Sequence, residues 1–236
     1  MLTRRLWALV PAAGRGTRMG AERPKQYLPL RGRTVLQHTL ERLGSFPLLQ
    51  GMLVGIAPAD PYWPTLALRI PGLLGSFAGG AERAQTVLNG LQALAGQARD
   101  EDWVLVHDAV RPCVRVADLR RLMDAVGDDP DGGLLGLPLA DTVKRSDEAG
   151  RIVATIPRQG LWRALTPQLF PIGVLRAALQ RARDEGVEVT DEASAVERAG
   201  GRPRMVAGSA DNIKITVPGD LALAELYLER QAAEAI

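Results

Sequence analysis

The chain has 236 residues, 46% of them hydrophobic, and a formal net charge of +2. This length fits one α/β domain with an ample core, and the balanced charge, without basic runs interleaved with aromatic residues, gives no indication of nucleic-acid binding. A single cysteine, Cys113, excludes an intrachain disulfide, and two histidines, His38 and His107, argue against a zinc site. No apolar run reaches the length of a membrane span, so no membrane partner is expected.

The cellular compartment follows from two weak signals. A lone cysteine favours a reducing environment. The first predicted strand begins within a few residues of Met1, which leaves no room for a signal or transit peptide. We therefore expect a cytoplasmic protein.

Apolar runs of strand length alternate along the chain with segments of helical periodicity. The expected strands are residues 6–10, 51–57, 73–77, 103–107, 134–139, 204–207 and 213–217. The expected helices begin after a Thr34 cap, then cover 62–68 (one short turn), 84–94, 116–126, 172–185 and 191–199, with a last helix from Leu221. Such alternation predicts one α/β domain over residues 1–236, with a mostly parallel sheet covered on both faces.

One segment departs from this alternation. Residues 142–145 and 152–156 are β-prone and flank a polar turn at 146–150. This pattern predicts a β-hairpin, and its position outside the α/β alternation favours a projecting arm. Projecting hairpins have exposed edges, which commonly pair with a partner chain.

A glycine-rich, basic loop follows the first predicted strand. It runs from Val10 to Gly20 with the sequence VPAAGRGTRMG, and Pro24-Lys25 follows it. Glycine lets the backbone approach a ligand closely, and bare N–H groups with two or three cations suit a triphosphate. The loop lacks the Walker A pattern, and Met19 stands where the dinucleotide fingerprint needs its third glycine. It predicts a nucleotide site of another kind, with an ordinary turn and solvated arginines as the alternative.

Further polar clusters follow other predicted strands, where α/β proteins bind ligands. They are Gly79-Gly80-Ala81-Glu82-Arg83 with Thr86, His107-Asp108-Ala109-Val110-Arg111, and Asp211-Asn212-Ile213-Lys214. Asp108, at the end of a central strand, suits Mg²⁺ shared with phosphates, since Mg²⁺ takes one or two carboxylates plus substrate oxygens. Each cluster also has a structural alternative: Gly79-Gly80 as a turn, Thr86 bonded to its own helix backbone, and Asp108 as a cap.

Other reactive side chains favour structural roles. We expect Cys113 to be a buried thiol, His107 to pack or form hydrogen bonds, and Thr190-Asp191-Glu192 to begin a helix. No Ser/His/Asp order and no metal-ligand spacing is present. A cationic, glycine-lined site with one well-placed carboxylate suits phosphoryl or nucleotidyl transfer, in which catalysis is mostly positioning and charge stabilisation.

Taken together, these motifs resemble those of a known family. The first block is Pro11-Ala12-Ala13-Gly14-x-Gly16-x-Arg18-Met19 with Pro24-Lys25-Gln26-Tyr27. Later blocks are Gly79-Gly80-x-Glu82-Arg83, Val106-His107-Asp108-Ala109-x-Arg111-Pro112, Asp141-Thr142-Val143-Lys144, Arg158-x-Gly160-Leu161-Trp162, Leu165-Thr166-Pro167-Gln168, Thr190-Asp191-Glu192-Ala193 and Asp211-Asn212-Ile213-Lys214. This order, over essentially the whole chain, resembles the 2-C-methyl-D-erythritol 4-phosphate cytidylyltransferases of the non-mevalonate isoprenoid pathway.

The resemblance implies a fold and a reaction. The fold is a doubly wound, mostly parallel α/β sheet of the Rossmann-like nucleotidyltransferase type, with residues 139–158 forming a β-arm that swaps across a homodimer. The reaction, assisted by Mg²⁺, transfers CMP from CTP to methylerythritol phosphate and releases pyrophosphate. No general base is needed, because the acceptor phosphate is already a nucleophile.

The resemblance also implies roles for single residues. Those at the cytidine are Ala12, Ala13, Gly14, Gly80 and Thr86, while Ala109 and Asp108 lie at the ribose and the metal. The catalytic cations are Arg18, Lys25 and Lys214, joined by Arg158 from the partner's arm. Arg111, Thr142, Thr166 and Thr190, with Asp108, contact the sugar phosphate.

Three departures and two rival functions accompany this hypothesis. Ala81 stands where the family often has Asp, Thr86 replaces a commoner Ser, and Val110 replaces a usual Ala. One rival is a cytidylyltransferase for another polyol phosphate, such as ribitol 5-phosphate. The other is a catalytically silent nucleotide-binding module, against which the presence of Arg18, Lys25, Asp108 and Lys214 argues.

Overall fold

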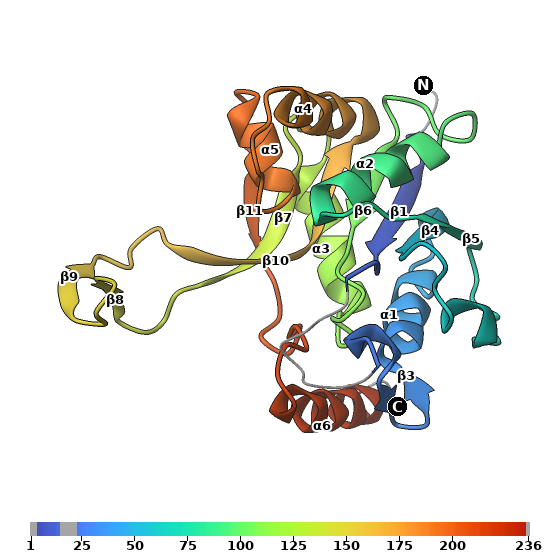
Figure 1. Cartoon of the computed structure of the whole chain (residues 1–236), viewed down its shortest axis with the longest axis horizontal. Helices are drawn as coiled ribbons and strands as arrows, with labels where there is room; N and C mark the ends of the chain where they lie inside the picture. The colour runs from blue at the N-terminus through green and yellow to red at the C-terminus, as the bar shows by residue number, and fades with distance from the viewer. Residues whose placement is uncertain (1–3, 15–22, 235–236) are drawn as a thin grey trace.

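The computed structural model describes residues 4–14 and 23–234 and is built around one seven-stranded sheet (Figure 1). The strand order is β11-β7-β10-β6-β1-β4-β5. The strands are β1 (Leu6–Pro11), β4 (Leu49–Ile56), β5 (Leu73–Ala78), β6 (Trp103–Val106), β7 (Gly133–Pro138), β10 (Trp162–Pro171) and β11 (Arg204–Ala207). Four strand pairs are parallel, namely β1 with β4, β1 with β6, β4 with β5, and β11 with β7. The mostly parallel α/β sheet predicted from the sequence is therefore confirmed.

Helices cover both faces of the sheet. The helices α1 (Val35–Gly44) and α3 (Val116–Val126) pack on one face, where their apolar side chains join those of β1, β4 and β6 in one buried cluster. The helices α2 (Arg83–Ala93), α4 (Ile172–Asp184) and α5 (Glu192–Arg198) share a second cluster on the other face (Figure 1). Thr34 caps α1 in a capping box with Gln37, as expected from its position. This arrangement is a doubly wound sandwich.

A third, smaller cluster lies where α6 (Gly219–Ala233) closes one end of the molecule. Ala224 and Leu228 of α6 pack against Cys113, Val110 and Ile215. Short elements complete this end: the 3₁₀ helix η2 (Lys25–Tyr27) and the ribbon of β2 (Pro29–Leu30) with β3 (Arg33–Thr34). The predicted short turn at 62–68 is the 3₁₀ helix η3 (Trp63–Thr65). Among the described helices, none is long and apolar enough to span a bilayer.

The predicted strand at 213–217 is wrong. The segment pairs with no strand of the sheet, and the Ile215 N–H donates to the Val110 carbonyl at 2.9 Å. The Asp220 carboxylate accepts from the N–H groups of Thr216 and Val217 at 2.7 and 2.9 Å. Ile215 is buried against α6 and not against the sheet. This burial explains why the segment has the alternation of apolar residues that is typical of a strand.

Strand β10 was not predicted, although it is the longest strand in the sheet. It runs antiparallel to both β6 and β7, with a shift in register between Ala164 and Gln168. Pro167 and Gln168 interrupt its apolar run, and proline is uncommon inside central strands. Because β10 is antiparallel to β6 and β7, its first residues lie at the edge of the sheet where β1 and β6 end.

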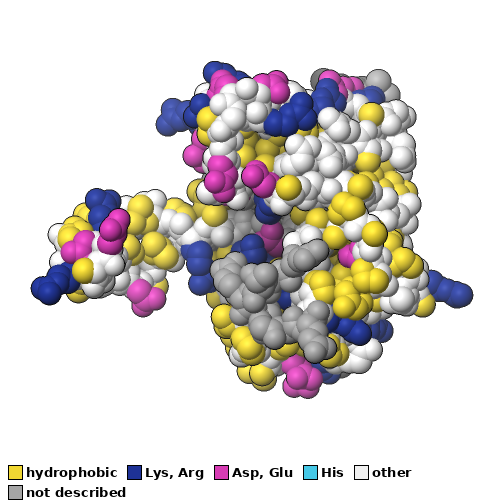
Figure 2. Space-filling model, in the orientation of Figure 1, with side chains coloured by type: hydrophobic (Ala, Val, Ile, Leu, Met, Phe, Trp, Pro, Cys, Tyr) yellow, Lys and Arg dark blue, Asp and Glu magenta, His cyan; other side chains and the backbone are white. Residues whose placement is uncertain are grey.

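The predicted hairpin is confirmed. Strands β8 (Val143–Ser146) and β9 (Ile152–Ile156) pair antiparallel and project far from the body (Figure 1). Hydrophobic side chains on the arm are open to solvent (Figure 2), with Ile152 66% and Val153 58% exposed. The use of this apolar surface as a dimer contact stays a prediction.

Candidate active site

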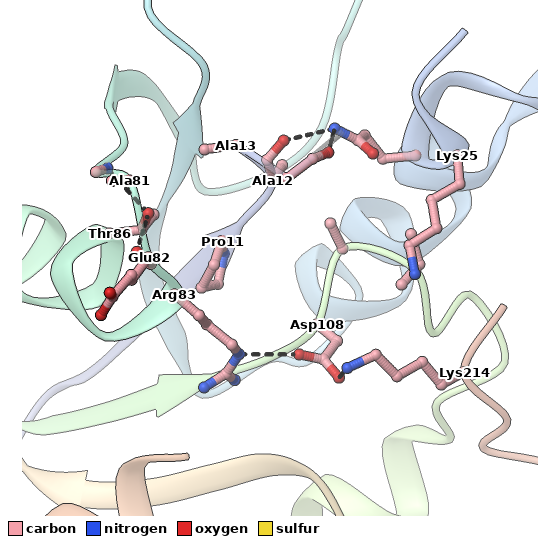
Figure 3. A pocket seen from close by; sticks show the side chains of 15 residues that line it. Pro11, Ala12, Ala13, Lys25, Ala81, Glu82, Arg83, Thr86, Asp108 and Lys214 are labelled. Carbon is pink, nitrogen blue, oxygen red and sulfur yellow. Dashed lines mark hydrogen bonds and ion pairs between the residues drawn. The ribbon is translucent and has the colours of Figure 1, made fainter. Parts of the chain in front are cut away.

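A cavity opens where β1 and β6 end and α2 begins (Figure 3). Its lining comes from five parts of the chain: residues 11–14, Lys25 and Gln26, residues 80–83 with Thr86, residues 108–110, and Lys214. All six residues expected at the nucleotide line this cavity, namely Ala12, Ala13, Gly14, Gly80, Thr86 and Ala109. Their individual contacts to a nucleotide stay predictions.

The first described part of the glycine-rich loop is held by neighbouring backbone and by Gln26. The Ala12 N–H donates to the Gly55 carbonyl at 2.7 Å. The Gln26 side-chain amide donates to the carbonyls of Ala12 and Gly14 at 2.6 and 3.0 Å. At Gly79 a Cβ would lie 2.5 Å from the Cβ of Ala13, so only glycine permits this approach. Residues 15–22, including Arg18, lie outside the described residues.

Thr86 combines its structural and functional alternatives. Its hydroxyl donates to the Glu82 carbonyl at 3.0 Å, one turn back along α2. The same oxygen accepts the Gly80 N–H at 3.0 Å. Thr86 therefore fixes the glycine turn at the wall of the cavity, whatever it contacts in a bound nucleotide.

Lys25 points into the cavity from η2 (Figure 3), and its ammonium donates to the Ile215 carbonyl at 3.1 Å. The next residues anchor η2. The Tyr27 hydroxyl donates to Asp60 at 2.9 Å, and Asp60 also accepts the N–H groups of Tyr62 and Trp63. This anchoring fixes the position of η2 and therefore the point from which the Lys25 side chain extends into the cavity.

Asp108 is the centre of the site. Its Oδ1 lies 3.3 Å from Arg83 Nε, and its Oδ2 lies 3.2 Å from Arg111 Nε and 3.0 Å from Lys214 Nζ. Arg83 and Lys214 approach the carboxylate from opposite sides (Figure 3). Burial alone would raise the pKa of Asp108, but the charges of Arg83, Lys214 and Arg111 outweigh it and hold that pKa well below its usual range. Asp108 is therefore an anion that gathers three cations.

The pair of Arg83 and Glu192 was missed by the sequence reasoning as part of the site. Arg83 Nη1 donates to Glu192, a carboxylate only 1% exposed at the start of α5. Burial raises the pKa of Glu192, while the charge of Arg83 opposes that rise. Arg83 thus links α2, beside the nucleotide cavity, to α5. The motif contained both residues, but no spacing signal indicates a pair 109 positions apart.

A second cavity adjoins the first and shares Arg83, Asp108 and Lys214 with it. The predicted acceptor residues Arg111, Thr166 and Thr190 line it, together with Gln168 and Asp191. Asp191 caps α5 in a capping box with Ser194, so the predicted helix start at 190–192 is confirmed. Since the shared residues form the boundary, a ligand in one cavity abuts a ligand in the other.

Buried hydrogen bonds fix the floor of the second cavity. The Thr166 hydroxyl accepts the Asp108 N–H at 3.1 Å and lies 3.0 Å from His107 Nδ1. Burial lowers the pKa of His107 to about 4, so the ring is neutral and structural, as expected. Arg111 donates to the Asn212 carbonyl at 2.8 Å, and the Asn212 amide donates to the Thr166 carbonyl at 2.8 Å.

Two predicted residues lie away from these cavities. Thr142 is exposed at the root of the arm, and Arg158 is exposed in the connection between β9 and β10, where its guanidinium donates to the Ala140 carbonyl. Neither lines either cavity of its own chain. Cys113 is fully buried, and burial raises its thiol pKa to about 12, so it is structural as expected.

The comparisons with known proteins agree with this geometry. A family model described as 2-C-methyl-D-erythritol 4-phosphate cytidylyltransferase matches residues 6–230. The chain belongs to this family. Two proteins named 2-C-methyl-D-erythritol 4-phosphate cytidylyltransferase, from Hahella chejuensis and Aeromonas hydrophila, are 52% and 54% identical over 96% and 97% of this chain, and the matches cover 94% and 91% of their own lengths. The family expected from the motifs is thereby confirmed.

Solved structures of cytidylyltransferases share the fold. One described as 4-diphosphocytidyl-2C-methyl-D-erythritol synthase gives a TM-score of 0.85 at 40% identity, covering 97% of this chain and 100% of its own. The 2-C-methyl-D-erythritol 4-phosphate cytidylyltransferase of Francisella tularensis gives 0.82 at 33% identity, covering 94% and 99%. The mixed, mostly parallel sheet with flanking helices is therefore the fold of the family.

Three carboxylates line the two cavities: Glu82 lines the first, Asp191 lines the second, and Asp108 lines both. Within 4–14 and 23–234, no cluster of three or more His, Cys, Asp or Glu side chains could hold an ion alone. Asp108 is ionised and borders both cavities. This donor set fits Mg²⁺, which is held mainly by substrate phosphates and one or two protein carboxylates.

Proposed function

We propose that the chain transfers CMP from CTP to 2-C-methyl-D-erythritol 4-phosphate, giving CDP-methylerythritol and pyrophosphate for isoprenoid precursor synthesis. The observation that carries this proposal is the boundary shared by the two cavities, where Arg83 and Lys214 meet Asp108 at 3.3 and 3.0 Å. One cavity has the glycine-lined wall of a nucleotide site, and the other has hydroxyl and amide groups suited to a polyol. The relatives' names supply the identity of both substrates.

The reaction needs no general base. An oxygen of the acceptor phosphate attacks the α-phosphorus of CTP, the new P–O bond forms, and the bond to the β-phosphate bridge breaks with release of pyrophosphate. The main obstacle is bringing two anions together. We assign Arg18 and Lys25 to the triphosphate, and Lys214 with Arg158 to the acceptor phosphate, so that positioning and charge neutralisation provide the rate enhancement.

Mg²⁺ is the proposed cofactor. When bound, it would neutralise charge on the CTP phosphates, and Asp108 is the residue that would hold it together with those phosphates. In the structure, both oxygens of Asp108 face cations. Arg83 and Arg111 fix the orientation of the carboxylate, while Lys214, on an exposed side chain, is free to turn toward a phosphate.

A homodimer formed through the arm, residues 139–158, completes the proposal. Arg158 and Thr142 are exposed and lie outside the cavities of their own chain, while the arm carries the exposed apolar residues Ile152 and Val153. Pairing with a second copy would bury this apolar surface. It would also bring Arg158 and Thr142 to the partner's acceptor cavity.

We also propose that the enzyme acts in the cytoplasm. Its single cysteine is a buried free thiol. This thiol chemistry fits a reducing compartment.

An acceptor panel tests the function. Purified protein with CTP and Mg²⁺ is given methylerythritol phosphate, ribitol 5-phosphate or no acceptor, and pyrophosphate release is followed. We expect release that depends on methylerythritol phosphate. Preference for ribitol 5-phosphate would reassign the acceptor, and no release with either would indicate a silent nucleotide-binding module.

A further inference from the structure

A third cavity lies beyond Lys214 and is used by neither half of the proposed site. It is lined by Arg111, Arg163 and Lys214 together with Leu165, Asn212, Ile213, Thr216 and Asp220. Arg111 and Lys214 also line the acceptor cavity, and Lys214 lines the nucleotide cavity as well. The three cavities therefore adjoin one another at Lys214.

Arg163 owes its position to the antiparallel course of β10. Since β10 pairs antiparallel with β6, its first residues lie at the edge where β6 delivers Asp108. Arg163 is exposed on that edge. Figure 2 shows Lys and Arg side chains gathered where the arm joins the body, next to this edge.

The charges around this cavity are unbalanced. Arg111 and Lys214 both form ion pairs with one carboxylate, that of Asp108. The Asp220 carboxylate accepts hydrogen bonds from two backbone N–H groups. Among the described residues, no carboxylate pairs with Arg163. Arg111 and Arg163 line the same cavity, and burial lowers the pKa of Arg111, an effect that Asp108 opposes and the positive charge of Arg163 adds to. Two cations so placed favour an anion between them.

Asn212 adds a built polar wall. Asn212 is 1% exposed, and its amide nitrogen donates a hydrogen bond to the Thr166 carbonyl. Its Oδ1 is buried and has no partner among the described residues. A buried acceptor without a partner is rare in folded proteins, so this wall of the cavity is not fully satisfied by the protein itself. The cavity thus combines two cations with a wall that contains one unfilled hydrogen bond.

We propose that this cavity is a capture subsite for the phosphomonoester of a polyol phosphate, and that Arg163 is the residue that first binds that phosphate. Arg163 draws the dianion in, Arg111 faces it from the buried side, and Lys214 receives it at the boundary with the nucleotide cavity. The role of the cavity as a substrate site deepens the proposed function and rests on it. The affinity of the cavity for a phosphate anion does not depend on that function.

The test compares Arg163→Gln with Arg163→Lys and a matched control, Arg202→Gln. Arg202 is also exposed and loses the same charge, but it precedes β11 at the opposite edge of the sheet. At low salt we expect Arg163→Gln to raise the acceptor KM about tenfold, with the CTP KM within about twofold of wild type. Arg163→Lys should stay within about threefold because it retains the charge, and Arg202→Gln should match wild type.

Two further readouts separate capture from a structural role. The difference between wild type and Arg163→Gln should shrink as ionic strength rises. Inorganic phosphate, used as a probe in equilibrium titration, should bind Arg163→Gln more weakly than Arg202→Gln. Equal phosphate affinity and equal acceptor KM in these two variants would overturn the subsite, and so would an equal rise in the KM of CTP and acceptor. If wild type turns over no acceptor, the proposed function fails, while the phosphate titration still decides the anion site.

Discussion

The buried pair of Arg83 and Glu192 gives a sharp test of how the site is held together. We consider Arg83→Met, which keeps the length of the side chain and removes its charge. Asp108 keeps Arg111 and Lys214 as partners, at 3.2 and 3.0 Å, so it stays ionised. Glu192, which is 1% exposed, loses its cation. The substitution therefore isolates the effect of an unpaired carboxylate under α5.

The magnitude follows from the burial of Glu192. Removing one partner of a buried ion pair costs about 3–5 kcal/mol of unfolding free energy. For a chain of this size, roughly 2–4 °C of Tm is lost per kcal/mol, so at neutral pH we expect a drop of roughly 6–20 °C. Burial already raises the pKa of Glu192, and without Arg83 it rises further. The deficit is fully present above that folded pKa and disappears as pH falls below the unfolded value of about 4.3.

Thermal unfolding of wild type and variant between pH 4 and pH 8 measures this directly. The double variant Arg83→Met/Glu192→Gln is the control, because removing both partners should restore most of the lost stability. A deficit that is the same at pH 4 and pH 8 and is not relieved by Glu192→Gln would refute the reasoning. It would mean that Arg83 stabilises through packing rather than through Glu192.

Three further predictions concern catalysis, assembly and stability. Lys25→Ala and Arg18→Ala should each lower kcat by about 100-fold or more while the acceptor KM changes only a few-fold; near-normal turnover in both would contradict their role at the triphosphate. Randomly mixed dimers of Arg158→Ala and Lys214→Ala subunits should regain about one quarter of wild-type activity. Half of these dimers are heterodimers, and each heterodimer has one intact site out of two. No recovery after verified subunit exchange would exclude an arm that acts in trans. Asp102→Asn should lower Tm by several degrees at neutral pH, because the buried carboxylate accepts from Arg5, Trp7 and Arg99, and an unchanged melting curve would show that these bonds add nothing.

The pH dependence of the Asp102 effect has a definite sign. Burial alone would raise the pKa of Asp102, but hydrogen bonds from Arg99 and Arg5 outweigh it and hold that pKa below its usual range. The stabilisation is thus present above the unfolded pKa and is lost as pH falls through the folded pKa. The difference in Tm between wild type and Asp102→Asn should therefore narrow in strong acid.

Local patterns in the sequence were sufficient for most of the architecture. The alternation of apolar runs and helical periods predicts the layers, and the cap at Thr34 and the helix start at Asp191 are both present. The hairpin was predictable because a break in the α/β alternation is itself a local signal. Its position far from the body follows from the same break (Figure 1).

Long-range pairing explains what the sequence could not reveal. The segment 213–217 has the alternation of a strand, yet Ile215 is buried by α6, which lies later in the chain. Strand β10 was hidden by its proline and glutamine, although it is the element that brings Arg163 and Thr166 to the site. Neither pattern contains information about which distant element packs against it.

The site itself was predictable in part. Asp108 and Lys214 come from motifs, and the rule that strand ends meet at one edge of a parallel sheet brings them together. Arg83 and Glu192 meet only because α2 and α5 pack on the same face. The sequence motif contains both residues but does not show that they touch.

The most direct test of the central claim is the ³¹P NMR spectrum of wild-type protein with CTP, methylerythritol phosphate and Mg²⁺. If the shared boundary at Asp108 and Lys214 aligns the two substrates, the CTP signals should be replaced by those of a CDP-polyol diester and pyrophosphate in equal amounts, with the acceptor phosphate signal consumed in step. Unchanged CTP would contradict this account. CMP and pyrophosphate with untouched acceptor would contradict it too, since water rather than the acceptor phosphate would then be the nucleophile.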